Sequence, residues 1–116
     1  MATTECIFCK IVAGELPAAV VRQDEHTVAF RDINPQAPTH VLVVPKRHIP
    51  AVDALEDVDA ELIGRLVLAA KAVARQEGIA GAGYRLVLNN GPAAGQTVDH
   101  VHLHVLGGRQ MHWPPG

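Results

Sequence analysis

The sequence has few aromatic residues. Among its 116 residues there are one tryptophan, one tyrosine and two phenylalanines. A hydrophobic content of 48% must therefore come mostly from valine, leucine, isoleucine and alanine, and small side chains bury little area each. The length suits a single domain, residues 1–116, with a real core, and is too short for two. Because the core is built from small side chains, dimerisation would add useful buried area.

Long apolar runs and runs of one charge sign are also missing. No apolar stretch approaches the roughly 20 residues that span a bilayer, and no basic, apolar and small-residue leader is present. Positive and negative residues are interspersed, with a formal net charge of −2. This balance argues against a nucleic-acid polymer or an anionic membrane as partner. We therefore expect a cytoplasmic protein that binds small molecules.

Cysteine is scarce, yet the two cysteines lie close together as Cys6-Ile7-Phe8-Cys9. In a reducing compartment this spacing more often binds a metal or serves redox exchange than forms a structural disulfide. A redox role would want a following helix in a β-α-β unit, which the sequence does not clearly offer. Two thiolates cannot complete a tetrahedral zinc site, so histidines are the natural further ligands. Two semi-buried structural thiols are the alternative.

In contrast, histidine is well represented. Three histidines alternate with aliphatic residues in His100-Val101-His102-Leu103-His104-Val105-Leu106. Side chains of a strand alternate between faces, so this pattern predicts imidazoles on one face and Val101, Leu103 and Val105 buried on the other. Imidazole can act as metal ligand, general base or nucleophile near neutral pH. The pattern therefore indicates a metal site or a phosphoryl-transfer site, and a solvated, histidine-rich strand face is the alternative.

The remaining segments predict an α+β fold. The expected elements are a short helical turn over 7–13, strands over 20–22, 27–31 and 40–45, a long helix over 57–77, and strands over 84–89 and 100–106. In the long helix, apolar residues recur at steps of three and four, and Gly78 follows as a left-handed cap. This order predicts a meandering antiparallel sheet of about five strands with the helices on one side.

Several segments resemble the histidine triad (HIT) family. Residues 100–108 match its signature, and the segment Gly108-Arg109-Gln110-Met111-His112-Trp113-Pro114-Pro115-Gly116 is similar to the Hint branch of purine nucleoside phosphoramidases. Further similarity lies, in family order, at 6–11, 32–40, 45–48 and 89–97. The resemblance covers nearly the whole sequence. It implies a HIT-like fold with one long and one short helix, whose sheet extends across a homodimer.

The same resemblance implies a hydrolase that cleaves the P–N bond of purine nucleoside phosphoramidates. Its substrates would be AMP or GMP conjugates, such as adenosine 5′-phosphoramidate or aminoacyl adenylate-like compounds. His102 would attack the α-phosphorus and carry the nucleotide covalently, a task within reach of neutral imidazole near pH 7. His104, His40 and Thr97 would complete the catalytic set as phosphate donor, orienting or relaying group, and hydroxyl donor. The alternatives are a dinucleoside polyphosphate hydrolase of a sister HIT branch and a nucleotide-binding interaction module.

Ten residues are implied as nucleotide-binding: Phe30, Asp32, Ile33, Asn89, Gly95, Gln96, Thr97, His102, His104 and Trp113. Asp32 has the chemistry to grip both ribose hydroxyls, and Phe30 with Ile33 would form an apolar wall against the purine. In Hint-like dimers the tail with Trp113 reaches toward the other subunit's site. Simpler structural roles are the alternatives at four positions: a turn for Asp32 and Asn89, a strand start for His40 and a frayed terminus for Trp113.

For the metal, family members with the cysteine pair suggest a Cys2His2 zinc site made of Cys6, Cys9, His48 and His100. Strict alternation would put His100 on the face of His102, although one residue would hold metal and the other would attack phosphorus. A bulge or a late strand start at His100 would remove this conflict. A closed site with four protein ligands has no open position for catalysis, so the zinc would be structural and would anchor the N-terminal segment to the sheet.

Overall fold

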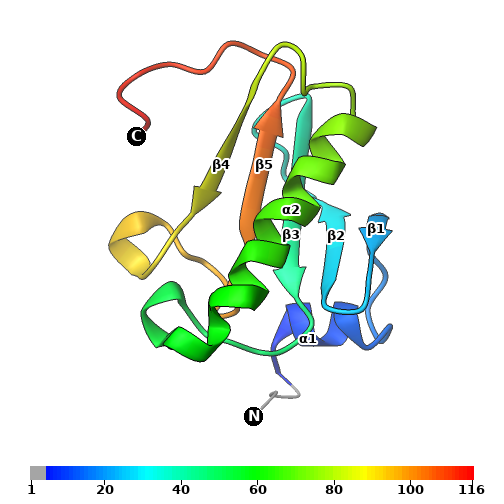
Figure 1. Ribbon diagram of the computed structural model, residues 1–116, viewed down its shortest axis with the longest axis vertical. Coiled ribbons are helices and arrows are strands. Elements are labelled where there is room, and N and C mark those ends of the chain that lie inside the picture. Colours follow the sequence, from blue (N-terminus) through cyan, green and yellow to red (C-terminus); the bar gives the residue numbers. More distant parts are fainter. Residues whose placement is uncertain (1–4) are drawn as a thin grey trace.

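The computed structural model describes residues 5–116 and contains one sheet with α-helices on both of its faces (Figure 1). The strands are β1 (Val20–Gln23), β2 (Thr27–Arg31), β3 (Thr39–Pro45), β4 (Tyr84–Leu88) and β5 (Leu103–Gly107), and the α-helices are α1 (Ile7–Val12) and α2 (Ala60–Gln76). Short 3-10 helices η1 (Val52–Ala54), η2 (Asp57–Asp59) and η3 (Pro92–Ala94) lie in the connections. Within residues 5–116, no helix has the length and apolar character needed to cross a membrane.

All strand pairs are antiparallel, in the order β1-β2-β3-β5-β4. The predicted meander is therefore wrong at one point, because β5 lies between β3 and β4 instead of beyond β4. His104 of β5 stands opposite Leu42 of β3 and opposite Val87 of β4. Burial explains the insertion, since Leu103 and Val105 of β5 are 2% and 0% exposed, whereas an edge strand keeps one side in solvent. The histidine strand thus has both of its neighbours fixed by the sheet.

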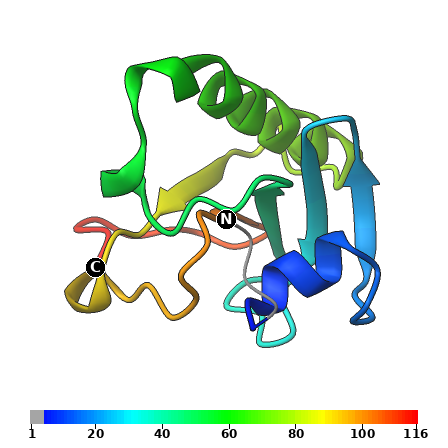
Figure 2. The ribbon, with the colours of Figure 1, turned by 90° about the horizontal axis from the view of Figure 1, so that it is seen from below.

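The two α-helices lie on opposite faces of the sheet, so the prediction that they share one side is wrong (Figure 2). Helix α2 crosses one face over β2, β3 and β5. Central strand β3 is apolar on both faces: Val41 and Val43 belong to the core under α2, while Leu42 and Val44 pack with Phe8 of α1. A strand that is apolar on both sides needs a cover on each, and α1 supplies the second one.

Helix α2 packs closely on the sheet through small side chains, as predicted. Its buried residues are Leu66, Ala69, Ala70, Val73 and Ala74. The α-helix starts three residues later than expected, because Asp57–Asp59 form a 3-10 turn before Ala60. Gly78 has a φ of 74°, which confirms the left-handed cap.

The histidine strand starts at Leu103, later than the predicted His100. Before it, the His100 N–H donates to the carbonyl of Val98, and the Val101 N–H donates to the carbonyl of Ile49. Val101, Leu103 and Val105 are nevertheless buried together under α2, as the alternation predicted. The late start is one of the two arrangements expected to separate the surroundings of His100 from those of His102.

Candidate functional site

A cleft of about 450 Å³ opens on the α1 face of the sheet. Six of the predicted nucleotide-binding residues line it: Phe30, Asp32, Ile33, Thr97, His102 and His104. Most of the remaining wall is apolar and comes from α1, from residues 17–19 and from Leu42 and Val98. An apolar cleft with a few convergent polar groups is the usual form of a small-molecule site.

Helix α1 contributes a wall that the sequence analysis missed. Ile7, Phe8 and Ile11 all line the cleft. The cysteine pair drew attention to this segment only as a metal motif. A usable signal was the spacing of Ile7 and Ile11, because residues four apart in a helix share one face.

His102 has a fixed proton position. Its side chain lines the cleft, the residue is only 6% exposed, and its Nδ1 lies 2.7 Å from the carbonyl oxygen of His100. A carbonyl can only accept, so Nδ1 carries the proton and Nε2 keeps its lone pair. The ring of Phe8 packs edge-on against the imidazole, with 5.1 Å between the centroids. A buried imidazole with one oriented lone pair has the properties of a nucleophile.

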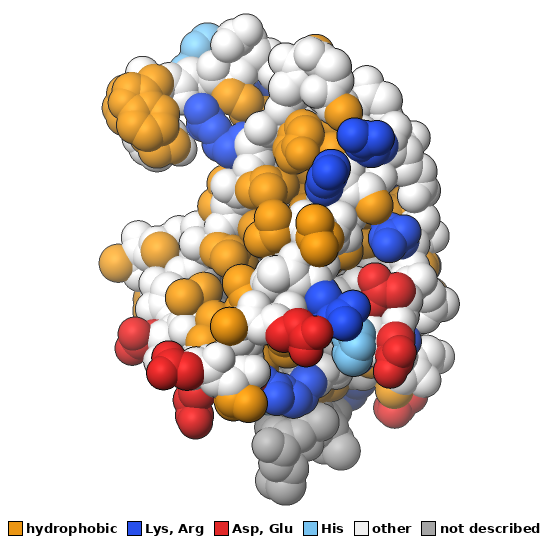
Figure 3. All heavy atoms as spheres, in the orientation of Figure 1, with side chains coloured by type: hydrophobic (Ala, Val, Ile, Leu, Met, Phe, Trp, Pro, Cys, Tyr) orange, Lys and Arg blue, Asp and Glu red, His pale blue; other side chains and the backbone are white. Residues whose placement is uncertain are grey.

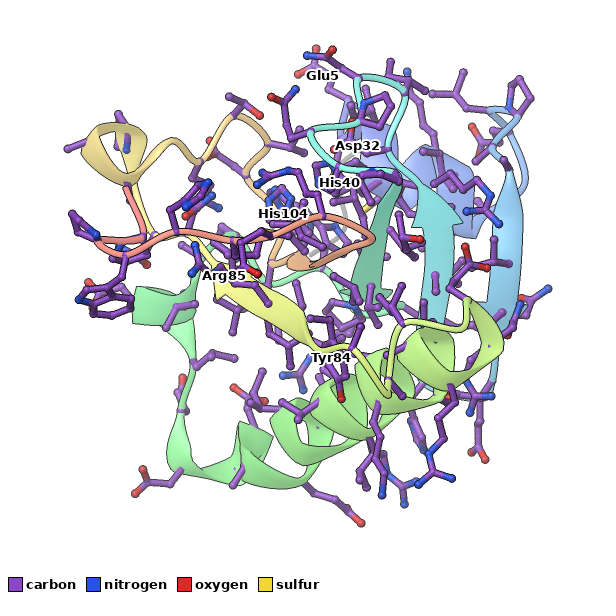
Figure 4. The ribbon with its side chains drawn as sticks, turned by 90° about the horizontal axis from the view of Figure 1, so that it is seen from above. Glu5, Asp32, His40, Tyr84, Arg85 and His104 are labelled. Carbon is purple, nitrogen blue, oxygen red and sulfur yellow. The ribbon has the colours of Figure 1, made fainter. Side chains whose placement is uncertain are left out.

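His40 and His104 form a second hydrogen-bonded chain, with Asp32 beside them (Figure 4). The backbone N–H of Gln36 donates to His40 Nδ1 over 3.0 Å, so the proton of neutral His40 is on Nε2. This Nε2 lies 2.8 Å from His104 Nδ1, which therefore accepts. The proton of His104 is then on Nε2, a buried atom without a hydrogen-bond partner in the described part of the chain. His104 lines the cleft, so a small shift of the ring would bring this N–H to a ligand oxygen.

The electrostatics of these rings agree with that proton pattern. Burial lowers the pKa of His40, and the nearby Asp32 carboxylate opposes the effect. Burial also lowers the pKa of His104 to about 4, with smaller contributions from His102 and His40. Both rings are thus neutral near pH 7, as a relay through single protons requires.

The Asp32 carboxylate stabilises a turn through a hydrogen bond, and the residue also lines the cleft. One carboxylate oxygen accepts the backbone N–H of Asn34 over 2.8 Å, as the turn alternative expected. The other oxygen lies 3.4 Å from His40 Nε2. Its neighbour Ile33 also lines the cleft and is fully exposed at 101%, so its whole side chain is accessible.

Asp32, His40 and His104 also form a group of three metal-ligand types, with ligand atoms within 4.8 Å of one another. Two histidines and a carboxylate are a common ligand set for transition metals. Here, however, the Gln36 N–H on His40 Nδ1 leaves the proton on Nε2, and a protonated nitrogen cannot bind a metal. The hydrogen bonds therefore describe a proton relay, which a metal would interrupt.

Four of the predicted nucleotide-binding residues do not line the cleft: Asn89, Gly95, Gln96 and Trp113. The Gln96 side chain accepts from the Gly91 N–H and donates to the carbonyls of Pro50 and Val98, so it holds its own loop together. Gly95 has a φ of 91°, which explains glycine there without a ligand. Trp113 is 83% exposed in the C-terminal tail, and its predicted role concerns a second subunit.

Four metal-ligand side chains converge beside the cleft. Cys6 and Cys9 come from the start of α1, His48 from the segment after β3, and His100 from the segment before β5. The two His Nδ1 atoms are 3.2 Å apart, and the Sγ-to-Nδ1 distances are 3.2, 3.4 and 3.6 Å. Zinc bonds of about 2.0–2.3 Å in a tetrahedron separate the ligand atoms by about 3.3–3.8 Å. The four side chains thus have nearly the spacing that zinc imposes.

The surroundings of His100 also suit a metal ligand. The residue is 0% exposed, and its Nε2 lies 2.9 Å from the carbonyl oxygen of Pro45. Donation from Nε2–H to this carbonyl leaves the Nδ1 lone pair directed at the thiols, a supporting bond typical of metal-bound histidine. The residues present therefore fit zinc.

Comparisons with known proteins agree with this geometry. A family model described as the HIT domain matches residues 13–111. An uncharacterized HIT-like protein of Synechocystis sp. is 53% identical over 112 residues, which are 97% of each chain. A 14 kDa zinc-binding protein of Zea mays is 52% identical over 112 residues, 95% of this chain and 87% of that protein. The crystal structure of a HIT family hydrolase from Legionella pneumophila has a TM-score of 0.95 and 54% identity, covering 97% of this chain and 100% of the other.

Proposed function

The chain belongs to the HIT family, and from that premise we propose that it hydrolyses purine nucleoside phosphoramidates. The substrate class is an AMP or GMP conjugate with a P–N bond, such as adenosine 5′-phosphoramidate or an aminoacyl adenylate-like compound. One observation supports the proposal most directly. His102 keeps a free Nε2 lone pair, His104 has an unpartnered N–H, and both residues line the same cleft.

The reaction would proceed in two displacements at phosphorus. His102 Nε2 forms a bond to the α-phosphorus while the P–N bond breaks, and the departing nitrogen takes a proton from solvent water to leave as the amine. Water then attacks phosphorus and releases His102, so over the full cycle water supplies the hydroxyl of the nucleotide and the proton of the amine. Two easier steps replace one difficult step.

The groups around His102 would stabilise the charge that develops on the phosphoryl oxygens. His104 Nε2–H would donate to one of these oxygens, and the exposed Thr97 at the cleft wall would offer its hydroxyl. His40 would keep His104 in the donor tautomer, because its own Nε2–H occupies His104 Nδ1. The apolar wall of Phe30, Ile33 and Leu42 would hold the base, with Asp32 placed for the ribose hydroxyls.

Steady-state hydrolysis of an adenosine 5′-phosphoramidate with a fluorogenic amine tests this function. The parent protein should turn over, and His102→Ala should lose at least about a thousandfold in kcat while remaining folded. His26→Ala is the matched control, because His26 lies outside the cleft, and it should retain parent activity. A parent protein that binds AMP without hydrolysing the phosphoramidate would contradict the proposal. Dinucleoside polyphosphate hydrolysis or a binding role would then be tested next.

We further propose a structural zinc ion held by Cys6, Cys9, His48 and His100, supported by the spacing of these ligands. When bound, zinc would cross-link α1 to the segments after β3 and before β5. All four positions are protein side chains, so the ion would have no open position for substrate. The zinc-binding relative from Zea mays is consistent with this proposal.

A homodimer that extends the sheet across β4 is the third part of the proposal. Leu86 and Leu88 point to the α2 face, opposite the buried Val105 and Leu103, yet remain 36% and 37% exposed. Helix α2 packs mainly on β2, β3 and β5, and in β4 Tyr84 reaches the core beneath it whereas the two leucines stay partly exposed. Apolar side chains gather there in Figure 3. A second copy of β4 would pair the open strand edge and cover this surface.

A further inference from the structure

Three of the four zinc-ligand side chains, Cys6, Cys9 and His100, lie in two segments of the chain that also line the nucleotide cleft. In α1, Cys6 and Cys9 face the ligand cluster, while the residues between them, Ile7 and Phe8, line the cleft. Around the start of β5, His100 belongs to the cluster, while residues on both sides of it in 97–102 line the cleft. Each ligand would therefore order segments that the other ligand also contacts.

Two residues connect the cluster to the predicted nucleophile directly. The Phe8 ring packs edge-on against both imidazoles, with centroid distances of 5.9 Å to His100 and 5.1 Å to His102. The carbonyl of His100 accepts the Nδ1–H of His102 over 2.7 Å. A shift of His100 would thus move the acceptor that sets the tautomer of His102.

Helix α1 is held by a small number of packing contacts. It is six residues long, Phe8 is its one buried residue in the described structure, and Ile11 and Val12 pack partly buried against the same core cluster. Helices this short are unstable alone, so their position depends on tertiary contacts. A metal bound to Cys6 and Cys9 would supply the strongest of these contacts.

We propose, on the basis of the zinc site and nucleotide cleft of the proposed function, that metal and purine nucleotide bind with positive coupling. Phe8 and His100 act as the positioning residues that link the two sites. Binding of one ligand orders α1 and residues 97–102. Binding of the second ligand then has a smaller conformational-entropy cost, because these segments are already ordered. The coupling is reciprocal, because the factor by which AMP tightens zinc must equal the factor by which zinc tightens AMP.

Two equilibrium measurements test the coupling without using turnover. The first is the apparent zinc Kd of the full chain, obtained by competition with a metal-buffering chelator with and without saturating AMP. The second is the AMP Kd by equilibrium dialysis, with and without zinc. We expect AMP to lower the zinc Kd about five- to tenfold and zinc to lower the AMP Kd by the same factor.

Variants can separate the proposed positioning role of Phe8 from its simpler role as part of the apolar cleft wall. Phe8→Leu keeps an apolar side chain but loses the ring contacts to both histidines, so it should bind one zinc per chain with a coupling factor within about twofold of unity. Ile33→Ala is the matched control, because Ile33 lines the same cleft and is not part of the zinc-ligand cluster. It should weaken AMP binding and leave the coupling factor of the parent unchanged.

His48→Ala covers the case in which Phe8→Leu does not fold. His48 belongs to the ligand cluster but does not line the cleft. This variant should bind AMP as weakly as the zinc-free parent and should not respond to zinc. AMP affinity equal to that of the zinc-loaded parent would overturn the coupling.

The outcomes distinguish this inference from the function on which it rests. A protein that binds both zinc and AMP, with the same zinc Kd in both conditions, overturns the coupling and leaves both sites standing. A protein that fails to bind zinc overturns the proposed metal site and the coupling with it. A protein that binds zinc but not AMP overturns the proposed nucleotide cleft, and the coupling with it.

Discussion

Identical side chains acquire opposite chemical roles in this site through their partners. His102 Nδ1–H donates to a carbonyl, so its Nε2 is an acceptor. His104 Nδ1 accepts from His40, so its Nε2 is a donor. The difference traces to two backbone groups, the carbonyl of His100 and the N–H of Gln36, which fix one proton each. Residue identity alone does not carry this information.

The donor role of His104 predicts a specific kinetic pattern. If its Nε2–H stabilises a phosphoryl oxygen, His104→Ala should lower kcat about a hundredfold, whatever group leaves. The comparison uses two AMP conjugates, one with an amine and one with p-nitrophenolate as leaving group. The two losses should agree within about threefold. A much larger loss with the amine would show that His104 instead protonates the leaving nitrogen.

The lowered pKa of His104 also predicts how stability depends on pH. The ordinary value is 6.5, and burial lowers the pKa in the folded protein to about 4. Above pH 6.5 the ring is neutral in both states and contributes nothing. Below it the unfolded chain binds a proton that the folded chain excludes, so stability falls as the pH drops toward 4. His104→Gln should remove this part of the loss, which is at most about 3 kcal/mol between pH 7 and pH 4.

Urea denaturation of the parent and of His104→Gln at pH 7 and pH 4 measures this difference. Groups that do not interact with His104 titrate alike in both proteins, so their effects cancel in the comparison, and the remaining difference belongs to His104 together with its neighbours His40 and His102. Equal losses in the two proteins would contradict a neutral, buried His104.

At the scale of elements, α2 offers two glycines with opposite expected effects. Gly64 lies inside the helix, and a Cβ built there meets nothing within 4 Å. Gly78 ends the helix with a φ of 74°, a backbone conformation that residues with a Cβ avoid. The same substitution at the two sites therefore separates helix propensity from backbone strain.

Gly64→Ala should stabilise the protein by about 0.5–1 kcal/mol, because alanine loses less backbone entropy in a helix. Gly78→Ala should destabilise it by about 1 kcal/mol. Thermal denaturation of both variants against the parent gives the two signs directly. Destabilisation by Gly64→Ala would mean that this face of α2 contacts something in solution, such as a second subunit.

At the scale of the whole molecule, the uncovered apolar surface of β4 in Figure 3 is the best marker of assembly. Leu86 and Leu88 lie on an edge strand beyond the cover of α2. Val67 and Leu68 of α2 add exposures of 42% and 62%. An open, apolar strand edge is a liability in a monomer, because it can pair with any other exposed strand.

Leu88→Asp should therefore convert a dimer into a monomer at micromolar concentration, because a carboxylate would be buried without a partner in the interface. The control is Leu16→Asp, at a leucine of 38% exposure in the segment between α1 and β1, and β1 is the strand at the sheet edge opposite β4. It should leave the mass unchanged. Light scattering coupled to size exclusion measures both masses, and a monomeric parent would contradict the interface.

The sequence alone determined features that depend on local order. The alternation of Val101, Leu103 and Val105 predicted the buried face of the histidine strand, and steps of three and four predicted α2 with its cap at Gly78. These patterns survive because side-chain direction repeats with the backbone of each element. The resemblance of many short segments gave the family.

Only the tertiary structure decided which elements became neighbours. Periodicity tells which face of a strand is apolar but not which strand lies beside it, so the insertion of β5 next to β3 and the placement of α1 opposite α2 were missed. For the same reason the α1 wall of the cleft was not foreseen. The proton positions on His40, His102 and His104 depend on hydrogen bonds that form only after these long-range contacts close. Local sequence sets the chemistry that is available, and packing sets where each proton and lone pair points.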